Sequence, residues 1–227
     1  WTAALAQPDI AIITNVTGAH VGEFGGMGQI AQAKSELLAG LSEQGSAILN
    51  RDDHYYAFWA SRAAPRRVVS FGFHPQADVS ASELSCDPQG RYAFTLLQHG
   101  QALGQVRLPL LGKHNVSNAL AAAAAALALG VPPEQIIERL ESLQALAGRL
   151  TVVSGLRGAK LLDDTYNANP GAVKAALDTL ASFPTPRWCA LGAMGELGDE
   201  AAALHADIGR YAAELGIDEL LTLGDAA

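Results

Sequence analysis

Cysteine is scarce in this chain, which holds only Cys86 and Cys189 among its 227 residues. The two lie far apart, outside any Cys-x-x-Cys pattern and outside any Cys/His cluster with the spacing of zinc ligands. This excludes a disulfide framework and a structural zinc site as the basis of the fold. A reducing, cytoplasmic environment is the one we expect.

Long apolar runs and an excess of positive charge are also missing. No run approaches the roughly 20 residues of a membrane-spanning helix, and the first residues lack the basic start of a signal peptide. Fifteen basic residues against 23 acidic ones give a net charge of −8. We therefore expect neither a membrane nor a nucleic acid as partner, although a nucleotide needs only local positive charge.

Several common catalytic motifs are absent as well. The chain has no Gly-x-x-x-x-Gly-Lys-Ser/Thr loop for phosphates, no Gly-x-Gly-x-x-Gly after a strand, and no Gly-x-Ser-x-Gly or His-Glu-x-x-His pattern. A Rossmann-like oxidoreductase is therefore disfavoured. The chain also lacks an initiating methionine and ends abruptly at Ala227, so we expect natural sequence on both sides of it.

The residues that are present favour a packed α/β protein, since 49% are hydrophobic and only 17% are charged. Short apolar runs predict buried strands at 10–14, 46–50 and 67–71. Between the first two, an apolar stripe from Met27 to Leu41 predicts a helix. Alternation over 92–110 indicates an antiparallel hairpin, and helices are expected over 118–129 and from Pro132. Together they predict a mostly parallel sheet with an antiparallel edge hairpin.

The pattern restarts after Ala147, and we therefore place one domain over residues 1–147 and a second over 148–227. Apolar runs and amphipathic stretches in the second domain predict strands at 160–163, 188–191 and 220–223, with helices at 170–182 and 199–215. This order is a βαβαβ unit of the Rossmann-like kind. In such sheets, ligands bind at the carboxyl ends of the strands.

Lys34 is the most informative single residue, because the helical pattern places it in the middle of an apolar face. That face is formed by Ile30, Leu37, Leu38 and Leu41. A lysine there must snorkel, form an ion pair or lose its charge. A neutral amine can take up carbon dioxide and become a carbamate, an anion able to bind a metal. The residues alone leave both the structural and the functional interpretation open.

His20 and Asn115 are candidate ligands in turns, each with a structural alternative. His20 ends the segment that follows the first strand, where a neutral imidazole can ligate a metal or form a hydrogen bond within the turn. Its pairing with Lys34 favours the metal without deciding the matter. Asn115 precedes an alanine-rich helix, and its amide can read an adenine edge or cap the helix.

The segment from Asp163 to Pro170 closes a predicted strand with two acids. Acids at this place in a turn between strand and helix commonly hold ribose hydroxyls. Asn169 followed by Pro170 is typical of a helix start, but this does not explain Asp164 or Tyr166. The segment is therefore a stronger indication of a binding site than a single turn residue.

The second domain offers two further candidates, Arg149 at its start and the glycine-rich turn after the strand at 188–191. Arg149 stands at the predicted boundary, where its guanidinium can reach a phosphate across a cleft or form an interdomain salt bridge. The turn from Gly192 to Gly198 is rich in glycine and is followed by a helix. Its structural interpretation is an ordinary turn with Asp199 as the helix cap.

Together these segments resemble the Mur ligases, and the match runs along almost the whole chain. Residues 14–20 with Ala33-Lys34 resemble the family's segment containing the metal-binding histidine and the carbamylated lysine. Residues 112–120 resemble its Gly-x-His-Asn-x-x-Asn segment, whose first asparagine contacts adenine. Gly148-Arg149 matches the arginine that approaches the nucleotide, and Asp164 corresponds to the ribose-binding acid.

The resemblance implies ATP and Mg²⁺ as cofactors of this chain. It also implies three groups of site residues: Lys34, His20 and Arg149 in catalysis; Asn115, Arg149, Asp164, Asn15 and Tyr166 in nucleotide binding; and His20 and carbamylated Lys34 as metal ligands. In the family, ATP phosphorylates a substrate carboxylate, and an amine then attacks the acyl phosphate.

Residues 164–170 and 194–198 resemble most the member that adds D-alanyl-D-alanine to UDP-N-acetylmuramoyl-tripeptide in peptidoglycan biosynthesis. This implies a cytoplasmic enzyme, which we expect to be a monomer. Ala193 stands where that member usually has aspartate. The alternatives are another ligase of the superfamily, such as a folylpolyglutamate synthase, and a non-catalytic nucleotide-binding paralogue. Because the family's phosphate-binding loop lies upstream of Trp1, we expect this chain alone neither to hydrolyse ATP nor to form the amide bond.

Overall fold

Residues 2–17 and 25–224 are described in the computed structural model of this chain. Within them, six strands form one sheet in the order of the sequence. They are β1 (Ile10–Ile13), β2 (Ser46–Asn50), β3 (Arg67–Gly72), β4 (Val79–Cys86), β5 (Arg91–Gln98) and β6 (Gln101–Leu111). Neighbours from β1 to β4 run parallel, whereas β5 is antiparallel to both β4 and β6. The predicted parallel sheet with an antiparallel edge is confirmed.

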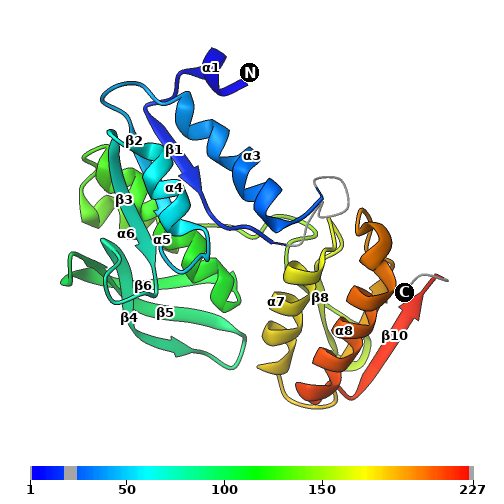
Figure 1. Cartoon of the computed structure of the whole chain (residues 1–227). Coiled ribbons are helices and arrows are strands. Elements are labelled where there is room, and N and C mark those ends of the chain that lie inside the picture. The colour runs from blue at the N-terminus through cyan, green and yellow to red at the C-terminus, as the bar shows by residue number, and fades with distance from the viewer. Residues whose placement is uncertain (1, 18–24, 225–227) are drawn as a thin grey trace.

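Helices cover both faces of this sheet (Figure 1). One face carries α3 (Met27–Ala39) and α4 (Tyr56–Ala63), with α1 (Thr2–Ala6) beside α3; the other carries α5 (Lys113–Ala128) and α6 (Pro133–Glu141). The side chains of β2 explain the layering. Ala47 and Leu49 join the apolar cluster with α3 and α4, whereas Ile48 joins the cluster with α5, because successive strand residues point to opposite faces. Every residue of β2 is therefore buried.

Helix α5 begins earlier than its predicted start at Asn118. Its N-cap is Gly112, with φ of 85° and no side-chain cap hydrogen bond. Asn115 lies inside the first turn and not at the cap, so the structural alternative for Asn115 is wrong. The sequence does not reveal this start, because α5 begins with lysine, histidine and asparagine, which give no apolar periodicity.

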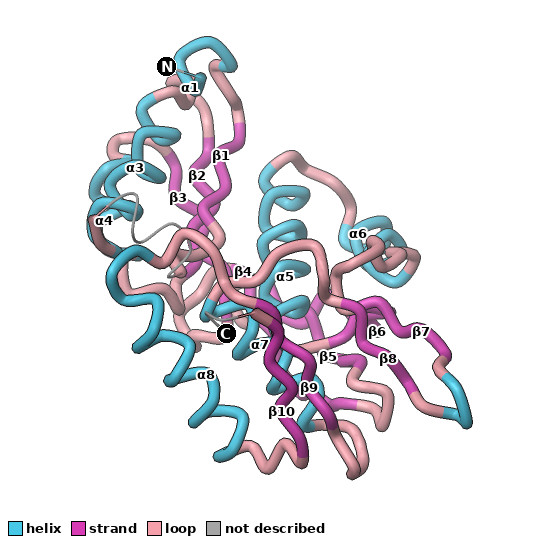
Figure 2. Tube along the Cα trace, turned by 90° about the vertical axis from the view of Figure 1, so that its right-hand side faces the viewer, coloured by secondary structure: helices cyan, strands magenta, loops and turns pink. Residues whose placement is uncertain are grey.

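The later part of the chain forms a separate layer. Its elements are β7 (Thr151–Ser154), the 3₁₀ helix η1 (Leu156–Gly158), β8 (Lys160–Asp163), α7 (Pro170–Ala181), β9 (Trp188–Gly192), the 3₁₀ helix η2 (Gly198–Glu200), α8 (Ala201–Glu214) and β10 (Glu219–Leu223). The predicted order β8-α7-β9-α8-β10 is confirmed, and β9 and β10 pair in parallel. β8 pairs with β7 in an antiparallel hairpin. The hairpin and the β9–β10 pair are two separate sheets, and they lie apart in Figure 2.

The starts of the two later helices differ in how they are capped. Asn169 caps α7, because its Oδ1 accepts a hydrogen bond from Ala172 N at 3.0 Å, and Pro170 takes the first helical position as predicted. The structural interpretation of the turn, with Asp199 as the helix cap, is wrong on this point, since α8 begins at Ala201 and follows η2 without a side-chain cap. Among residues 2–17 and 25–224, no helix is long and apolar enough to cross a membrane.

Candidate functional site

The two layers meet along α7, whose start lies beside the loop after β1 and whose last turn lies beside the start of α5. A Cβ added to Gly171 in α7 would lie 3.3 Å from Thr17 Cβ in the loop after β1. A Cβ on Gly112 would lie 2.6 Å from Thr179 Oγ1 of α7. We call this region, formed by residues 14–17, 112–115, 148–150 and 163–171 with Thr179, the junction (Figure 1).

Arg149, Tyr166 and Asp164 lie together at the junction. The guanidinium carbon of Arg149 is 4.0 Å from the centroid of the Tyr166 ring. Two hydrogen bonds hold the segments together: Tyr166 N donates to Gly148 O at 3.1 Å, and Leu150 N donates to the Asp164 side chain at Oδ1, also at 3.1 Å. Both Arg149 and Tyr166 are exposed, so a ligand can reach the stacked pair.

The partners of Arg149 and Asp164 leave binding capacity on both side chains. Among the residues that the structure describes, Arg149 forms no ion pair with a carboxylate, so the interdomain salt bridge is not found there. Asp164 uses Oδ1 for Leu150 N, which leaves Oδ2 as an acceptor for a hydroxyl group. The exposed guanidinium is a permanent cation that suits a phosphate oxygen.

Asn115 is held in one orientation at the start of α5. Its Nδ2 donates to Leu111 O at 2.8 Å, and its Oδ1 accepts from Asn118 Nδ2 at 3.1 Å. Among the described residues, one amide hydrogen and one oxygen lone pair of Asn115 have no further partner, and these are the two groups that adenine N7 and N6 require. Asn118 was not assigned a role from the sequence; its signal is the spacing of three residues on one helix face.

His114 shows how close the start of α5 lies to the second layer. Burial lowers the pKa of His114, while the carboxylates of Asp164 and Asp178 oppose that shift. The two acids belong to the turn before α7 and to α7 itself. The start of α5, which carries His114 and Asn115, therefore lies near enough to both acids for their charges to act on His114.

The expected burial of Lys34 is wrong, because Lys34 is exposed on α3. The buried face of this helix consists of Ile30, Ala31, Ser35 and Leu38. The reason is Trp59 of α4, a fully buried residue whose indole Nε1 donates to Ala31 O at 3.0 Å. The small side chains of Ala31 and Ser35 admit the indole, and this rotates Lys34 away from the core.

Lys34 nevertheless lies beside the junction. It lines a shallow hollow together with Ile13 and Thr14 at the carboxyl end of β1. Asn15 follows Thr14 and is exposed. The predicted metal ligand His20 lies outside the described residues. Among the described residues, no three His, Cys, Asp or Glu side chains gather as metal ligands.

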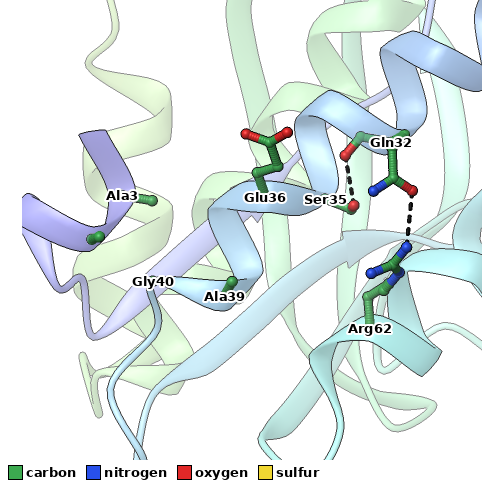
Figure 3. Close-up of a pocket in the computed structure, with 8 residues that line it drawn as sticks. Ala3, Gln32, Ser35, Glu36, Ala39, Gly40 and Arg62 are labelled. Atoms are coloured by element: carbon green, nitrogen blue, oxygen red, sulfur yellow. Dashed lines mark hydrogen bonds between the residues drawn. The ribbon is translucent and has the colours of Figure 1, made fainter. Parts of the chain in front are cut away.

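A second hollow, between α1, α3 and α4, holds none of the predicted site residues. Gln32, Ser35, Glu36 and Arg62 line it, and Figure 3 shows Arg62 Nη2 donating to Gln32 Oε1 at 3.0 Å. Arg62 also lies over the ring of Phe58, 5.3 Å from its centroid. These contacts use the polar groups of the hollow for packing of α4 against α3, so it is not a candidate site.

The glycine-rich turn after β9 is held by a residue that sequence reasoning missed. His205 of α8 accepts a hydrogen bond from Met194 N at its Nε2, at 2.9 Å. Its Nδ1 lies 2.7 Å from Ala201 O, to which it donates. Met194 is buried, whereas Ala193 is exposed. The turn therefore has a fixed backbone even though Ala193 offers no carboxylate.

Gly112→Ala is expected to lower the free energy of unfolding by about 2–3 kcal/mol, because the φ and ψ of Gly112 are almost unique to glycine. The added Cβ would also lie 2.5 Å from His114 Cε1. The matched control is Gly130→Ala, where φ is also positive but nothing lies within 4 Å; its expected cost is about 1 kcal/mol. Calorimetry of both variants checks this, and equal losses would show that Gly112 is not tightly packed at the junction.

Comparisons with known proteins cover both layers. Residues 1–126 match the family model described as the Mur ligase middle domain, and residues 148–227 match the Mur ligase glutamate ligase domain. The UDP-N-acetylmuramoyl-tripeptide--D-alanyl-D-alanine ligase of Escherichia coli K12 is 39% identical over 227 residues, which cover 99% of this chain and 49% of the relative. The enzyme of the same name from Mycobacterium tuberculosis H37Rv is 40% identical over 229 residues, covering 98% and 44%.

Solved structures agree with these relatives. A crystal structure of MurF from Acinetobacter baumannii has a TM-score of 0.93 and 40% identity, and the match covers 100% of this chain and 49% of that one. MurF from Thermotoga maritima, solved in complex with ADP, has a TM-score of 0.84 at 24% identity and a match over 99% and 54%; that likeness shows the fold alone. The chain spans about half the length of the curated relatives that it matches.

Proposed function

The chain belongs to the Mur ligase family, which confirms the resemblance, and from this premise we propose that its complete gene product joins D-alanyl-D-alanine to UDP-N-acetylmuramoyl-tripeptide with ATP. The observation that carries the proposal is 39% identity to the Escherichia coli enzyme of that name along 99% of this chain. The junction supports it, since it contains the Asn115 amide, the exposed Arg149 guanidinium and the Asp164 carboxylate, groups whose chemistry suits a nucleotide.

We propose that ATP binds at the junction. The unused amide groups of Asn115 suit the adenine edge, and the free Oδ2 of Asp164 suits a ribose hydroxyl. Tyr166 offers an exposed ring beside these groups, and Arg149 offers its guanidinium to the phosphates. Asn15 lies on the loop after β1 that reaches the start of α7.

We propose that Lys34, as a carbamate, and His20 are magnesium ligands. The described residues fit this role only in part, since Lys34 is accessible beside Thr14 but no cluster of acids surrounds it. Lysine amines are normally protonated at neutral pH, and formation of the carbamate would therefore need a cation to hold the anion. Bound magnesium would neutralise phosphate charge during acyl phosphate formation.

We propose that residues 1–147 and 148–227 are separate domains with Arg149 just beyond their boundary. The apolar clusters support this division, because the cluster built on α7 and α8 is separate from the two built on the six-stranded sheet. Closure of the second domain would bring Arg149 over the terminal phosphate and align the attacking amine with the acyl phosphate. The amine loses a proton as the new C–N bond forms and phosphate leaves.

We also propose that the complete gene product works as a cytoplasmic monomer without a membrane or nucleic acid partner. The net charge of −8 supports the absence of a polyanionic partner. The two free cysteines support a reducing compartment, because neither is placed for a disulfide with the other.

The complete gene product, incubated with ATP, Mg²⁺, D-alanyl-D-alanine and UDP-N-acetylmuramoyl-tripeptide, is expected to release phosphate and form the pentapeptide product. Single amino acids, including glutamate, in place of the dipeptide are expected to give no product. Mass spectrometry of the product and a phosphate assay measure both. The 227-residue chain alone is expected to be inactive in the same assay.

Each other outcome of this assay points to an alternative. Ligation of single amino acids or glutamate would identify another ligase of the superfamily, such as a different Mur enzyme or a folylpolyglutamate synthase. Binding of ATP without any ligation would identify a non-catalytic paralogue. Detectable ligation by the 227-residue chain would refute the expectation that this chain alone is inactive.

A further inference from the structure

The loop that leaves β1, residues 14–17, is held by two side chains from the end of β2. Asn50 Nδ2 donates to Thr14 O at 2.7 Å, and Val16 N donates to Asp53 Oδ2 at 2.8 Å. These two hydrogen bonds flank Asn15 on either side along the backbone. The loop itself is neither strand nor helix, so these bonds supply the fixation that a sheet ladder would otherwise give.

Asn50 and Asp53 are themselves fixed before they reach the loop. Asn50 is the last residue of the buried strand β2, has an exposed fraction of 7%, and accepts from Asp52 N at its Oδ1, at 2.9 Å. Asp53 accepts from Tyr55 N at its Oδ1, at 2.8 Å. In each side chain, Oδ1 accepts within the residue's own turn, and the second polar atom (Nδ2 of Asn50, Oδ2 of Asp53) bonds to the loop. These paired bonds hold each side chain in a single orientation.

The surroundings of the loop connect it with the proposed nucleotide site. Thr14 shares a hollow with Lys34, and Thr17 packs against Gly171 at the start of α7. The loop therefore lies between helix α3 and the second layer. A small displacement of its backbone would move Asn15 relative to Arg149 and Asp164, which belong to that layer.

We propose that Asn50 and Asp53 are positioning residues for ATP binding, which hold the loop so that Asn15 meets the nucleotide. The inference rests on the proposed function, in which Asn15 contacts ATP. Both would act through the backbone on either side of Asn15, to which their side chains are bonded. Misplacement of a contacting group by about 1 Å is enough to cost up to about 100-fold in rate.

Asp52 provides a matched control inside the same turn. Its Oδ2 accepts from Phe73 N at 2.7 Å and its Oδ1 accepts from His74 N at 2.8 Å. Asp52 and Asp53 are thus neighbours of the same residue type, each holding two backbone N–H groups. The Asp52 carboxylate holds the chain after β3, whereas that of Asp53 holds the loop after β1.

Asp53→Asn and Asp52→Asn in the complete gene product separate positioning from stability. An amide has one acceptor oxygen, and each variant therefore loses at least one of its two bonds. Both melting temperatures should fall, and that of Asp53→Asn should fall further, because its two bonds are partly buried whereas those of Asp52 are exposed. In Asp53→Asn alone, we expect the KM for ATP to rise about tenfold while the KM for D-alanyl-D-alanine stays within about twofold. Asn50→Asp, which turns a donor toward Thr14 O into an acceptor, is expected to show the same split.

The outcomes distinguish this inference from the function on which it rests. A wild-type protein without ligase activity contradicts the proposed function. An active wild type in which the Asp53 and Asp52 variants have equal KM values for ATP contradicts the inference alone. If Asp53→Asn fails to fold, Asn50→Asp carries the test with the same criteria.

Discussion

Arg149→Ala in the complete gene product is expected to lower kcat for ligation about 1,000-fold, because the variant loses the cation proposed to stabilise charge on the transferred phosphoryl group. The melting temperature should change little, since the side chain is exposed and its main contact is with the Tyr166 ring. Steady-state kinetics of phosphate release, together with calorimetry, measure both quantities.

Two companion variants make the Arg149 result specific. Arg149→Lys keeps the charge but loses the planar fork, and it should recover only part of the lost rate. Arg139→Ala removes another exposed arginine, in the last turn of α6, and should keep full activity. A kcat for Arg149→Ala within threefold of the Arg139→Ala value would remove Arg149 from the catalytic site.

Lys34→Arg is expected to lower kcat by about 100- to 1,000-fold. Arginine keeps the positive charge and the length of the side chain, but it cannot become a carbamate. The wild type should lose activity when bicarbonate and dissolved carbon dioxide are removed, and it should recover when bicarbonate is restored. The variant should respond to neither treatment.

Lys174→Arg is the control for Lys34→Arg. Lys174 pairs with Asp207 at 2.6 Å on the surface of α7 and α8, and arginine can keep that ion pair. This variant should retain wild-type kinetics and the bicarbonate response. If Lys34→Arg had the same activity as Lys174→Arg, Lys34 would be an ordinary surface lysine, and the carbamate would be excluded.

The strands that the sequence predicts best are those whose burial is complete. β2 and β3 are apolar along most of their length because helices cover both faces of the sheet, and such strands are read directly as apolar runs. Apolar runs do not predict β4 and β7. Serine and glutamate fill much of β4, and β7 is largely exposed, so pairing with a neighbouring strand decides their structure and hydrophobicity does not.

The candidate site likewise has features that short motifs reveal and features that depend on contacts between residues far apart in the sequence. The candidates Asp164, Tyr166 and Arg149 could be proposed from the sequence, because they belong to short motifs at the ends of predicted elements, and the structure places them close together. The orientation of α3 could not, since it depends on Trp59 of a different helix donating to Ala31 O. Asn50 and Asp53 also escaped, because their contacts with the loop after β1 span 36 and 37 residues along the chain.

A crystal structure of the complete gene product with Mg²⁺ and a non-hydrolysable ATP analogue tests the central claim most directly, because that claim is the location of the nucleotide. We predict the adenine within hydrogen-bonding distance of Asn115, the ribose on Asp164, and the phosphates between Arg149 and the loop that carries Asn15. A nucleotide bound away from residues 112–115 and 163–166 would contradict the account.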